Sequence, residues 1–195
     1  MTIHDISNGL LEAPVYPGDP APRLHRLKEL ENGDDCNLTA LYACSHAGTH
    51  VDAPSHFIEG GSTVGELDPA LFIGPCRVAA VFDPILTGAH IDALPLAGVR
   101  RLLLKGFGKS VLSRSAAYAL AAEDIRLIGI DMPSIAAPGE EAEVHRALLS
   151  AGIIILEGLR LSSVQSGDYT LIAPPVLVGG AEGAFCRALL IDERE

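Results

Sequence analysis

A short stretch of the chain, residues 46–56, gathers histidine and aspartate side chains at a density that is typical of a metal site. The stretch reads HAGTHVDAPSH, so His46, His50, Asp52 and His56 fall within eleven residues. Neutral imidazole and carboxylate together suit divalent ions such as zinc or manganese. Burying so many polar groups without compensation would be costly. The stretch therefore predicts a metal site, for which the rest of the chain must supply the remaining ligands.

Local propensities indicate that this stretch is extended rather than helical. Its glycine is about 1 kcal/mol less favourable than alanine in a helix, and Pro54 moves the residue before it out of the helical region. In a strand, alternate side chains share a face, so His46, His50 and Asp52 would point to one side. The intervening glycine would leave room for an ion or a neighbouring backbone. His56 follows Pro54, where it could face the same cavity as a proton-transfer group without binding metal.

A second pair of candidate ligands lies in the second half of the chain. The spacing of apolar residues predicts a helix that carries His145, and the apolar strand after it ends at Glu157. A carboxylate at the carboxyl end of a buried strand lies where open α/β sheets usually bind their ligands. If both residues meet the first cluster, the chain offers five ligands, which suit a site of two divalent ions. Asp131 also follows an apolar run, but the turn after it favours a structural capping role.

Two further residues could belong to the site. Residues 13–20 are too rich in proline and glycine for regular structure, so Tyr16 lies in a loop. This loop is either a surface turn in which Tyr16 packs or a lid that contacts a ligand, and the sequence alone leaves both open. Cys44 has the same strand parity as His46 and is conceivable as a ligand, although such a cysteine is more commonly a small buried hydrophobe.

Short apolar runs separated by turn signals predict the strands that must position these residues. They cover residues 77–82, 101–107, 126–130, 152–156, 169–172 and 187–191. Helices are expected over 113–123 and 140–150, and Gly152 would close the second one. Strands and helices alternate in the second half, while the first half is rich in strands. This order predicts one α/β domain over residues 1–195, with a mixed β-sheet core and flanking helices.

Composition restricts the class of protein and of partner. The chain has 195 residues, 48% hydrophobic and 20% charged, as expected of one ordered globular domain. A formal net charge of −11 disfavours nucleic acid and anionic membranes, which leaves a small molecule as the expected partner. No leader-like segment and no apolar run of about 18 residues is present, which predicts a cytoplasmic protein. The four cysteines form no CxxC pair, so reduced thiols are expected.

With both clusters located, the chain resembles the metal-dependent cyclase family, which includes bacterial arylformamidases. Residues 46–57 are similar to the family signature HxGxHxDxPxH, a highly specific pattern. Further matches are YPGD at 16–19, GIDMPS at 129–134 and ILEG at 155–158, which lies twelve residues beyond the second candidate histidine. The resemblance implies a swivelling β/β/α fold, a homo-oligomer such as a dimer or tetramer, and a binuclear centre of zinc or, as the alternative, manganese.

The resemblance also assigns the metal ligands residue by residue. By position, His46 and His50 would hold the first ion, and His145 would hold the second. Asp52 and Glu157 would contact both ions.

The implied activity is hydrolysis of an aryl formamide, N-formyl-L-kynurenine to L-kynurenine and formate, in tryptophan catabolism. His56 would be the proton donor and acceptor. The formamidase branch carries a substrate-contacting tryptophan in the first loop, where this chain has Tyr16; tyrosine still stacks on aromatic rings, but its size and hydroxyl could favour another substrate. One alternative is therefore another aryl or cyclic amide, such as isatin. A metal-stabilised binding protein without turnover is the other, but a closed structural site has no use for an unbound histidine such as His56.

Overall fold

The computed structural model describes residues 1–193 of the chain, and one mixed sheet of nine strands forms its core. The strands are β1 (Thr2–Asp5), β4 (His50–Asp52), β5 (Ile73–Ala80), β7 (Arg101–Lys105), β9 (Leu127–Ile130), β10 (Ile154–Glu157), β11 (Gly167–Ile172), β12 (Gly183–Phe185) and β13 (Leu189–Asp192). Their order across the sheet is β1-β13-β11-β5-β7-β9-β10-β4-β12. Neighbours from β5 to β10 pair in parallel, and the outer pairs are antiparallel.

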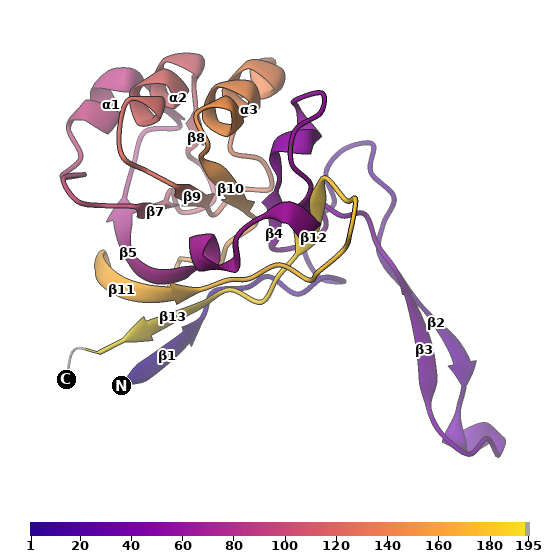
Figure 1. Ribbon diagram of the computed structural model, residues 1–195. Coiled ribbons are helices and arrows are strands. Elements are labelled where there is room, and N and C mark those ends of the chain that lie inside the picture. The colour runs from indigo at the N-terminus through magenta and orange to yellow at the C-terminus, as the bar shows by residue number, and fades with distance from the viewer. Residues whose placement is uncertain (194–195) are drawn as a thin grey trace.

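Three helices cover one face of the parallel strands (Figure 1). They are α1 (Gly88–Asp92), α2 (Arg114–Ala121) and α3 (Glu141–Ser150). Alternate residues of β7 serve two cores: Leu102 and Leu104 pack on the helical side, while Leu103 packs on the other. All three leucines are fully buried, which explains why the central strands read as continuous apolar runs.

The mixed α/β architecture expected from the sequence is confirmed. Each of the six predicted strands overlaps a strand of the sheet, and the two predicted helices correspond to α2 and α3. Gly152 follows α3 with a φ of 76°, as expected for a glycine that ends a helix. The short elements were not predicted: α1, the parallel pair β6 (Ile85–Leu86) and β8 (Val111–Leu112), and 3-10 turns η1 (Leu30–Asn32), η2 (Pro54–His56), η3 (Val64–Glu66) and η4 (Pro69–Phe72).

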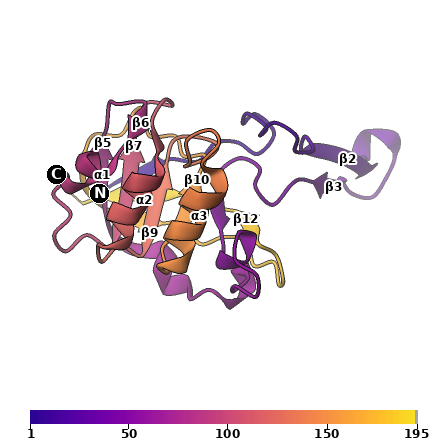
Figure 2. The same cartoon turned by 90° about the horizontal axis from the view of Figure 1, so that it is seen from above.

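A two-stranded hairpin projects from the body of the molecule (Figures 1 and 2). It consists of β2 (Arg23–Lys28) and β3 (Leu38–Tyr42), which pair antiparallel, with η1 in the connection at its far end. We call residues 23–42 the arm. Within residues 1–193, no helix is long and apolar enough to cross a membrane.

Candidate metal centre

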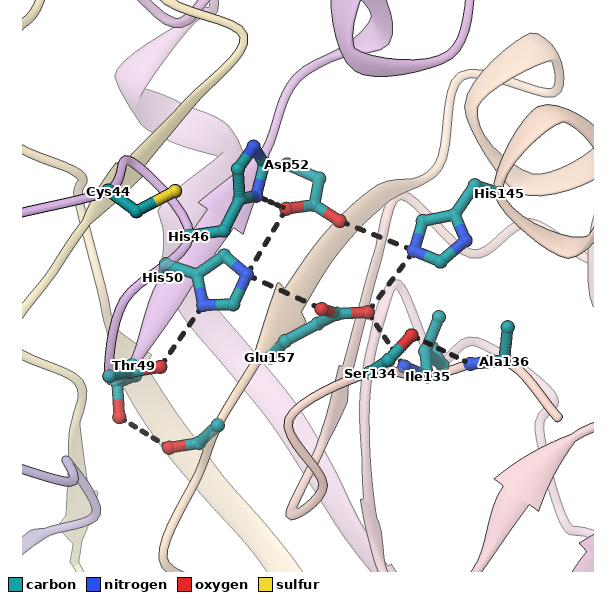
Figure 3. A network of polar contacts seen from close by, with 12 residues as sticks. Cys44, His46, Thr49, His50, Asp52, Ser134, Ile135, Ala136, His145 and Glu157 are labelled. Carbon is teal, nitrogen blue, oxygen red and sulfur yellow. Dashed lines mark hydrogen bonds and ion pairs between the residues drawn. The ribbon is translucent and has the colours of Figure 1, made fainter. Parts of the chain in front are cut away.

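The centre forms where β4 lies between β10 and β12. In the antiparallel pairing of β4 with β10, His50 lies opposite Glu157 and Asp52 lies opposite Ile155. His145, on α3, lies over the end of β10 and completes the group from a third element (Figure 3). The sequence brings these residues together because β10 is an apolar buried strand that ends in a single carboxylate.

The five candidate ligands of the sequence analysis form two groups that share one residue. Two groups of three have ligand atoms that all lie within 4.8 Å of one another, and Asp52 belongs to both. Asp52 Oδ1 lies 2.9 Å from His46 Nδ1 and 3.4 Å from His50 Nε2. Glu157 Oε2 lies 3.3 Å from His50 Nε2, and Glu157 Oε1 lies 3.3 Å from His145 Nε2. The two carboxylates thus lie between histidines on either side (Figure 3).

Backbone contacts orient two of the three imidazoles. His50 Nδ1 lies 3.1 Å from the carbonyl oxygen of Gly48, and His145 Nδ1 lies 2.6 Å from that of Glu141. A carbonyl can only accept, so each Nδ1 donates, and each Nε2 is directed toward the carboxylates. Glu157 Oε1 also accepts a hydrogen bond from the backbone N–H of Ile135 at 2.7 Å. Ligating histidines are characteristically fixed in this way through their second nitrogen.

The donor set fits divalent cations. His50, Asp52, His145 and Glu157 are each at most 3% exposed. Within the described part of the chain, Asp52 Oδ2 and His46 Nε2 are buried without a hydrogen-bond partner, although each lies near an oppositely charged or polar group. Unsatisfied buried polar atoms are uncommon in folded proteins, and a site that binds an ion is one reason for them. Imidazole nitrogen with carboxylate oxygen is the donor chemistry of zinc and manganese sites.

The carboxylates and histidines shift one another's pKa values in opposite directions. Burial alone would lower the pKa of His50, but hydrogen bonds to Asp52 and Glu157 outweigh burial and raise it well above its usual value. The same balance raises the pKa of His145 to about 10. Conversely, burial would raise the pKa of Asp52, but its three histidine neighbours hold that pKa well below its usual range. The group therefore strongly favours ionised carboxylates, the form that binds cations.

His56 lies beside the five candidate ligands, on the 3-10 turn η2. It ends η2, which begins at Pro54, and its ring stacks on that of His46 with 4.1 Å between centroids. With Tyr16 and Phe57, it lines a cavity of about 200 Å³ whose floor includes His145. Burial lowers the pKa of His56 from its usual value. His56 belongs to neither ligand group and lies at the cavity wall.

Comparison with known proteins places the chain in a family. The family model described as "Putative cyclase" matches residues 4–137. The chain belongs to the cyclase family. It is 37% identical over 95% of its length to a kynurenine formamidase of Geobacillus thermodenitrificans (strain NG80-2), of which it also covers 95%. A solved structure described as a potential metal-dependent hydrolase with cyclase activity shares 30% identity, with a TM-score of 0.84 over 100% of this chain and 99% of that one.

A more distant likeness supports the fold alone. Isatin hydrolase A of Labrenzia aggregata has a TM-score of 0.84 over 98% of this chain and 94% of its own, at 23% identity. The swivelling β/β/α fold of the cyclase family, expected from the resemblance, is thus confirmed.

The prediction of an extended segment is wrong for part of this cyclase-family signature. Only residues 50–52 form a strand, whereas His46 lies in a turn and Gly48 has a φ of 65°. The left-handed conformation of Gly48 ends the extended run, and its carbonyl oxygen packs so closely on Gly158 that a Cβ atom there would lie 2.2 Å from it. Thr49 Oγ1 reinforces this contact by donating to the Gly158 carbonyl at 2.5 Å. The turn still directs His46 to Asp52.

Two other expectations need correction. Asp131 does not cap the turn that follows it; its Oδ1 and Oδ2 accept from the backbone N–H groups of Gly106 and Gly108, so it holds the neighbouring loop. Cys44 lies outside any strand, and its Sγ is 3.7 Å from Asp19 Oδ2. It is in neither ligand group, so the strand-parity argument that related it to the site does not hold.

Sequence reasoning missed Glu182, which lies just before β12. Its Oε1 is 3.3 Å from His46 Nε2 and accepts a hydrogen bond from Ser45 Oγ at 2.6 Å. That hydrogen bond lowers the pKa of Glu182, while burial acts against it to a smaller extent. Gly183 follows, and a Cβ there would lie 2.6 Å from the His46 ring, so this glycine makes room for the imidazole. In the sequence, the only local feature at Glu182 is the glycine that follows it, and this feature does not indicate that Glu182 contacts His46.

Proposed function

We propose that this chain is a metal-dependent amide hydrolase that cleaves N-formyl-L-kynurenine to L-kynurenine and formate. One observation carries the proposal: three histidines and two carboxylates converge beside a cavity that a further histidine, His56, lines. The likeness to a kynurenine formamidase at 37% identity supports the choice of substrate.

We propose two divalent ions at the site, zinc first and manganese as the alternative. His46 and His50 would hold one, His145 the other, and Asp52 and Glu157 would contact both. When bound, such ions supply hydroxide at neutral pH and stabilise negative charge on a carbonyl oxygen.

Side chains around the cavity would transfer the proton and bind the substrate. As the formyl C–N bond breaks, the aryl amine nitrogen must gain a proton, and His56 is the group that donates it. Proton transfer by a positioned side chain contributes typically 10²- to 10⁴-fold to the rate. Tyr16 lies on the cavity wall at 40% exposure, where its ring is available to stack on the aromatic ring of the substrate.

The test measures formylkynurenine hydrolysis by purified protein before and after chelation, with zinc or manganese restored, beside metal content per chain. We expect turnover that disappears on chelation and returns with metal, at close to two ions per chain. His56→Ala should lower kcat by about 10²- to 10⁴-fold with metal content unchanged. The matched control is His90→Ala on α1, away from the cavity, which should retain wild-type turnover.

Two outcomes would contradict the proposal. Metal loss in His56→Ala equal to that of a ligand variant would make His56 a ligand instead. Bound metal with faster hydrolysis of isatin than of formylkynurenine would keep the centre and reject the substrate, which is the alternative that Tyr16 leaves open. We further propose that the chain works in the cytoplasm as a homo-oligomer, because its four cysteines are free thiols and its arm is uncovered.

A further inference from the structure

A second cavity adjoins the one beside the metal centre. It encloses about 420 Å³, and the two cavities share four lining residues, Tyr16, Pro133, Ser134 and Glu141. The cavity that His56 lines, at about 200 Å³, is smaller than the roughly 300–1,000 Å³ of typical ligand sites. A substrate whose formyl group lies at the metal centre would therefore extend past the shared residues into the second cavity, which we call the side chamber.

The side chamber has apolar walls and one basic side chain. Lys109 is the only lysine or arginine that lines either cavity. Within residues 1–193 it makes no ion pair. The apolar residues of the walls include Pro84, Ile85, Val111, Met132, Ala136 and Pro138. In a chain with a net charge of −11, an unpaired cation beside apolar walls is available to bind an anionic group of a ligand.

The loop that carries Lys109 is held in a strained conformation. Phe107 has a φ of 55° and is the only non-glycine residue with a positive φ in the described part of the chain. The Asp131 carboxylate holds this loop, because it accepts from the backbone N–H groups of Gly106 and Gly108 at 2.9 and 3.3 Å. The Lys109 N–H donates to the Gly106 carbonyl at 3.1 Å. Backbone strain of this kind occurs preferentially at ligand sites, and here it fixes the backbone of Lys109 beside the side chamber.

Glu141 supplies the opposite charge. It is the first residue of α3 and lines both cavities. Hydrogen bonds from backbone N–H groups, its own and that of Gly139, lower the pKa of the Glu141 carboxyl, so it is ionised at neutral pH. In residues 1–193, Glu141 and Lys109 form no ion pair with each other. The side chamber thus presents a cation and an anion that do not neutralise each other.

We propose that the side chamber binds the amino-acid group of the substrate, with Lys109 at its carboxylate and Glu141 at its ammonium. This inference rests on the proposed hydrolysis of formylkynurenine. That substrate carries, next to its formamide on the aromatic ring, a ketone chain that ends in an α-amino acid. With the formyl carbon at the metal centre and the ring beside Tyr16, which lines both cavities, this chain leads into the side chamber. Lys109 and Glu141 then select amides that carry an amino-acid group over isatin, which has none.

Kinetics with two formamides test the assignment. N-(2-acetylphenyl)formamide has the ring, ketone and formamide of formylkynurenine but lacks the amino-acid group. We expect wild-type kcat/KM to be about 10- to 100-fold higher for formylkynurenine. Lys109→Gln should lower this ratio about tenfold, the lower end for a hydrogen bond to a charged group, because Lys109 is exposed. Glu141→Gln should lower it by a similar factor.

The kinetic parameter that changes is a further readout. The loss in Lys109→Gln should appear in KM, because contacts away from the formyl carbon serve the ground state and the transition state alike. The matched control is Arg100→Gln, which removes an exposed positive charge at the opposite end of β7 and lines neither cavity. This variant should keep the wild-type ratio.

The outcomes separate this inference from the proposed function. Equal kcat/KM for the two formamides in the wild type, or an unchanged ratio in Lys109→Gln, would overturn the side chamber as an amino-acid site and leave formamide hydrolysis intact. Absence of hydrolysis of both formamides would overturn the proposed function instead. Titration calorimetry with L-kynurenine then tests the side chamber without turnover. Binding that Lys109→Gln weakens about tenfold would support the assignment, whereas no binding to the wild type, or equal binding to both proteins, would overturn it.

Discussion

Glu182 offers the sharpest test of how the centre is built. Two of the three histidines have their outward nitrogen fixed by a backbone carbonyl, that of Gly48 or Glu141. His46 has no such carbonyl; its Nδ1 points to Asp52 and its Nε2 lies 3.3 Å from Glu182 Oε1. We predict that Glu182 orients this ring when metal is bound, by accepting from Nε2–H. Replacing Glu182 should therefore weaken metal binding without removing a ligand.

The magnitude follows from the exposure of the carboxylate. Loss of a partner that orients a ligating histidine typically lowers metal affinity by about 10- to 100-fold. The Glu182 side chain is 43% exposed, so water replaces part of its effect, and we expect the lower end of this range. A tenfold loss corresponds to about 1.4 kcal/mol. Glu182→Gln retains an oxygen that can accept and should lose less affinity than Glu182→Ala.

The assay is competition for zinc between the protein and a chromophoric chelator. Glu123→Gln, at an exposed turn position just after α2, is the matched control and should bind like the wild type. Nitrogen-15 NMR of the imidazoles adds a second readout, because the Nε2–H tautomer of His46 should dominate in the wild type and lose its preference in Glu182→Ala. Wild-type affinity in Glu182→Ala would refute the reasoning. Loss of one whole ion would refute it too, since Glu182 would then be a ligand.

Three further predictions concern the cluster, the thiols and the backbone contact behind the site. Asp52→Asn should reduce bound metal below one ion per chain by elemental analysis, because Asp52 belongs to both ligand groups; full metal content would contradict the shared role. A thiol reagent at pH 8 should label exposed Cys36 in the folded protein but label Cys76 only after unfolding, because burial raises the pKa of Cys76 to about 12; rapid labelling of both would be inconsistent with this fold. Gly158→Ala should lower the free energy of unfolding by several kcal/mol, since its Cβ would lie 2.2 Å from a backbone oxygen, whereas Gly152→Ala, with open space around it, should lose only about 1 kcal/mol; equal losses in thermal unfolding would contradict the contact.

The elements that the sequence predicts correctly are those whose burial leaves a local pattern in the sequence. The strand over 101–107 is buried almost throughout and is therefore a continuous apolar run, while the helix over 140–150 buries residues at a helical spacing. The arm escaped prediction for the opposite reason. All six residues of β2 are exposed, so no pattern of buried and exposed positions marks it as a strand. Its structure depends on the pairing of β2 with β3.

The site residues also divide into those that the local sequence reveals and one that depends on a distant contact. His46, His50, Asp52 and His56 occur together in sequence, and their types alone indicate metal chemistry. The contribution of Glu182 depends instead on β12 pairing with β4, a contact between distant parts of the chain that leaves no periodic trace. A carboxylate before a glycine is too common a pair to identify a partner so far away.

The segment before β4 shows how the strand-alternation rule can fail even though the predicted ligands do come together. Alternation in an extended strand would have placed His46 and His50 on one face, and the ligands do converge, but by another route. The backbone turns at Gly48, where it passes so close to Gly158 that a Cβ atom on Gly158 would lie 2.2 Å from the Gly48 carbonyl oxygen. This contact lies immediately beside Glu157, whose Oε2 lies 3.3 Å from His50 Nε2. Convergence of the ligands therefore depends on how β4 and β10 meet, and the missing side chain of Gly158 allows the two backbones to approach this closely.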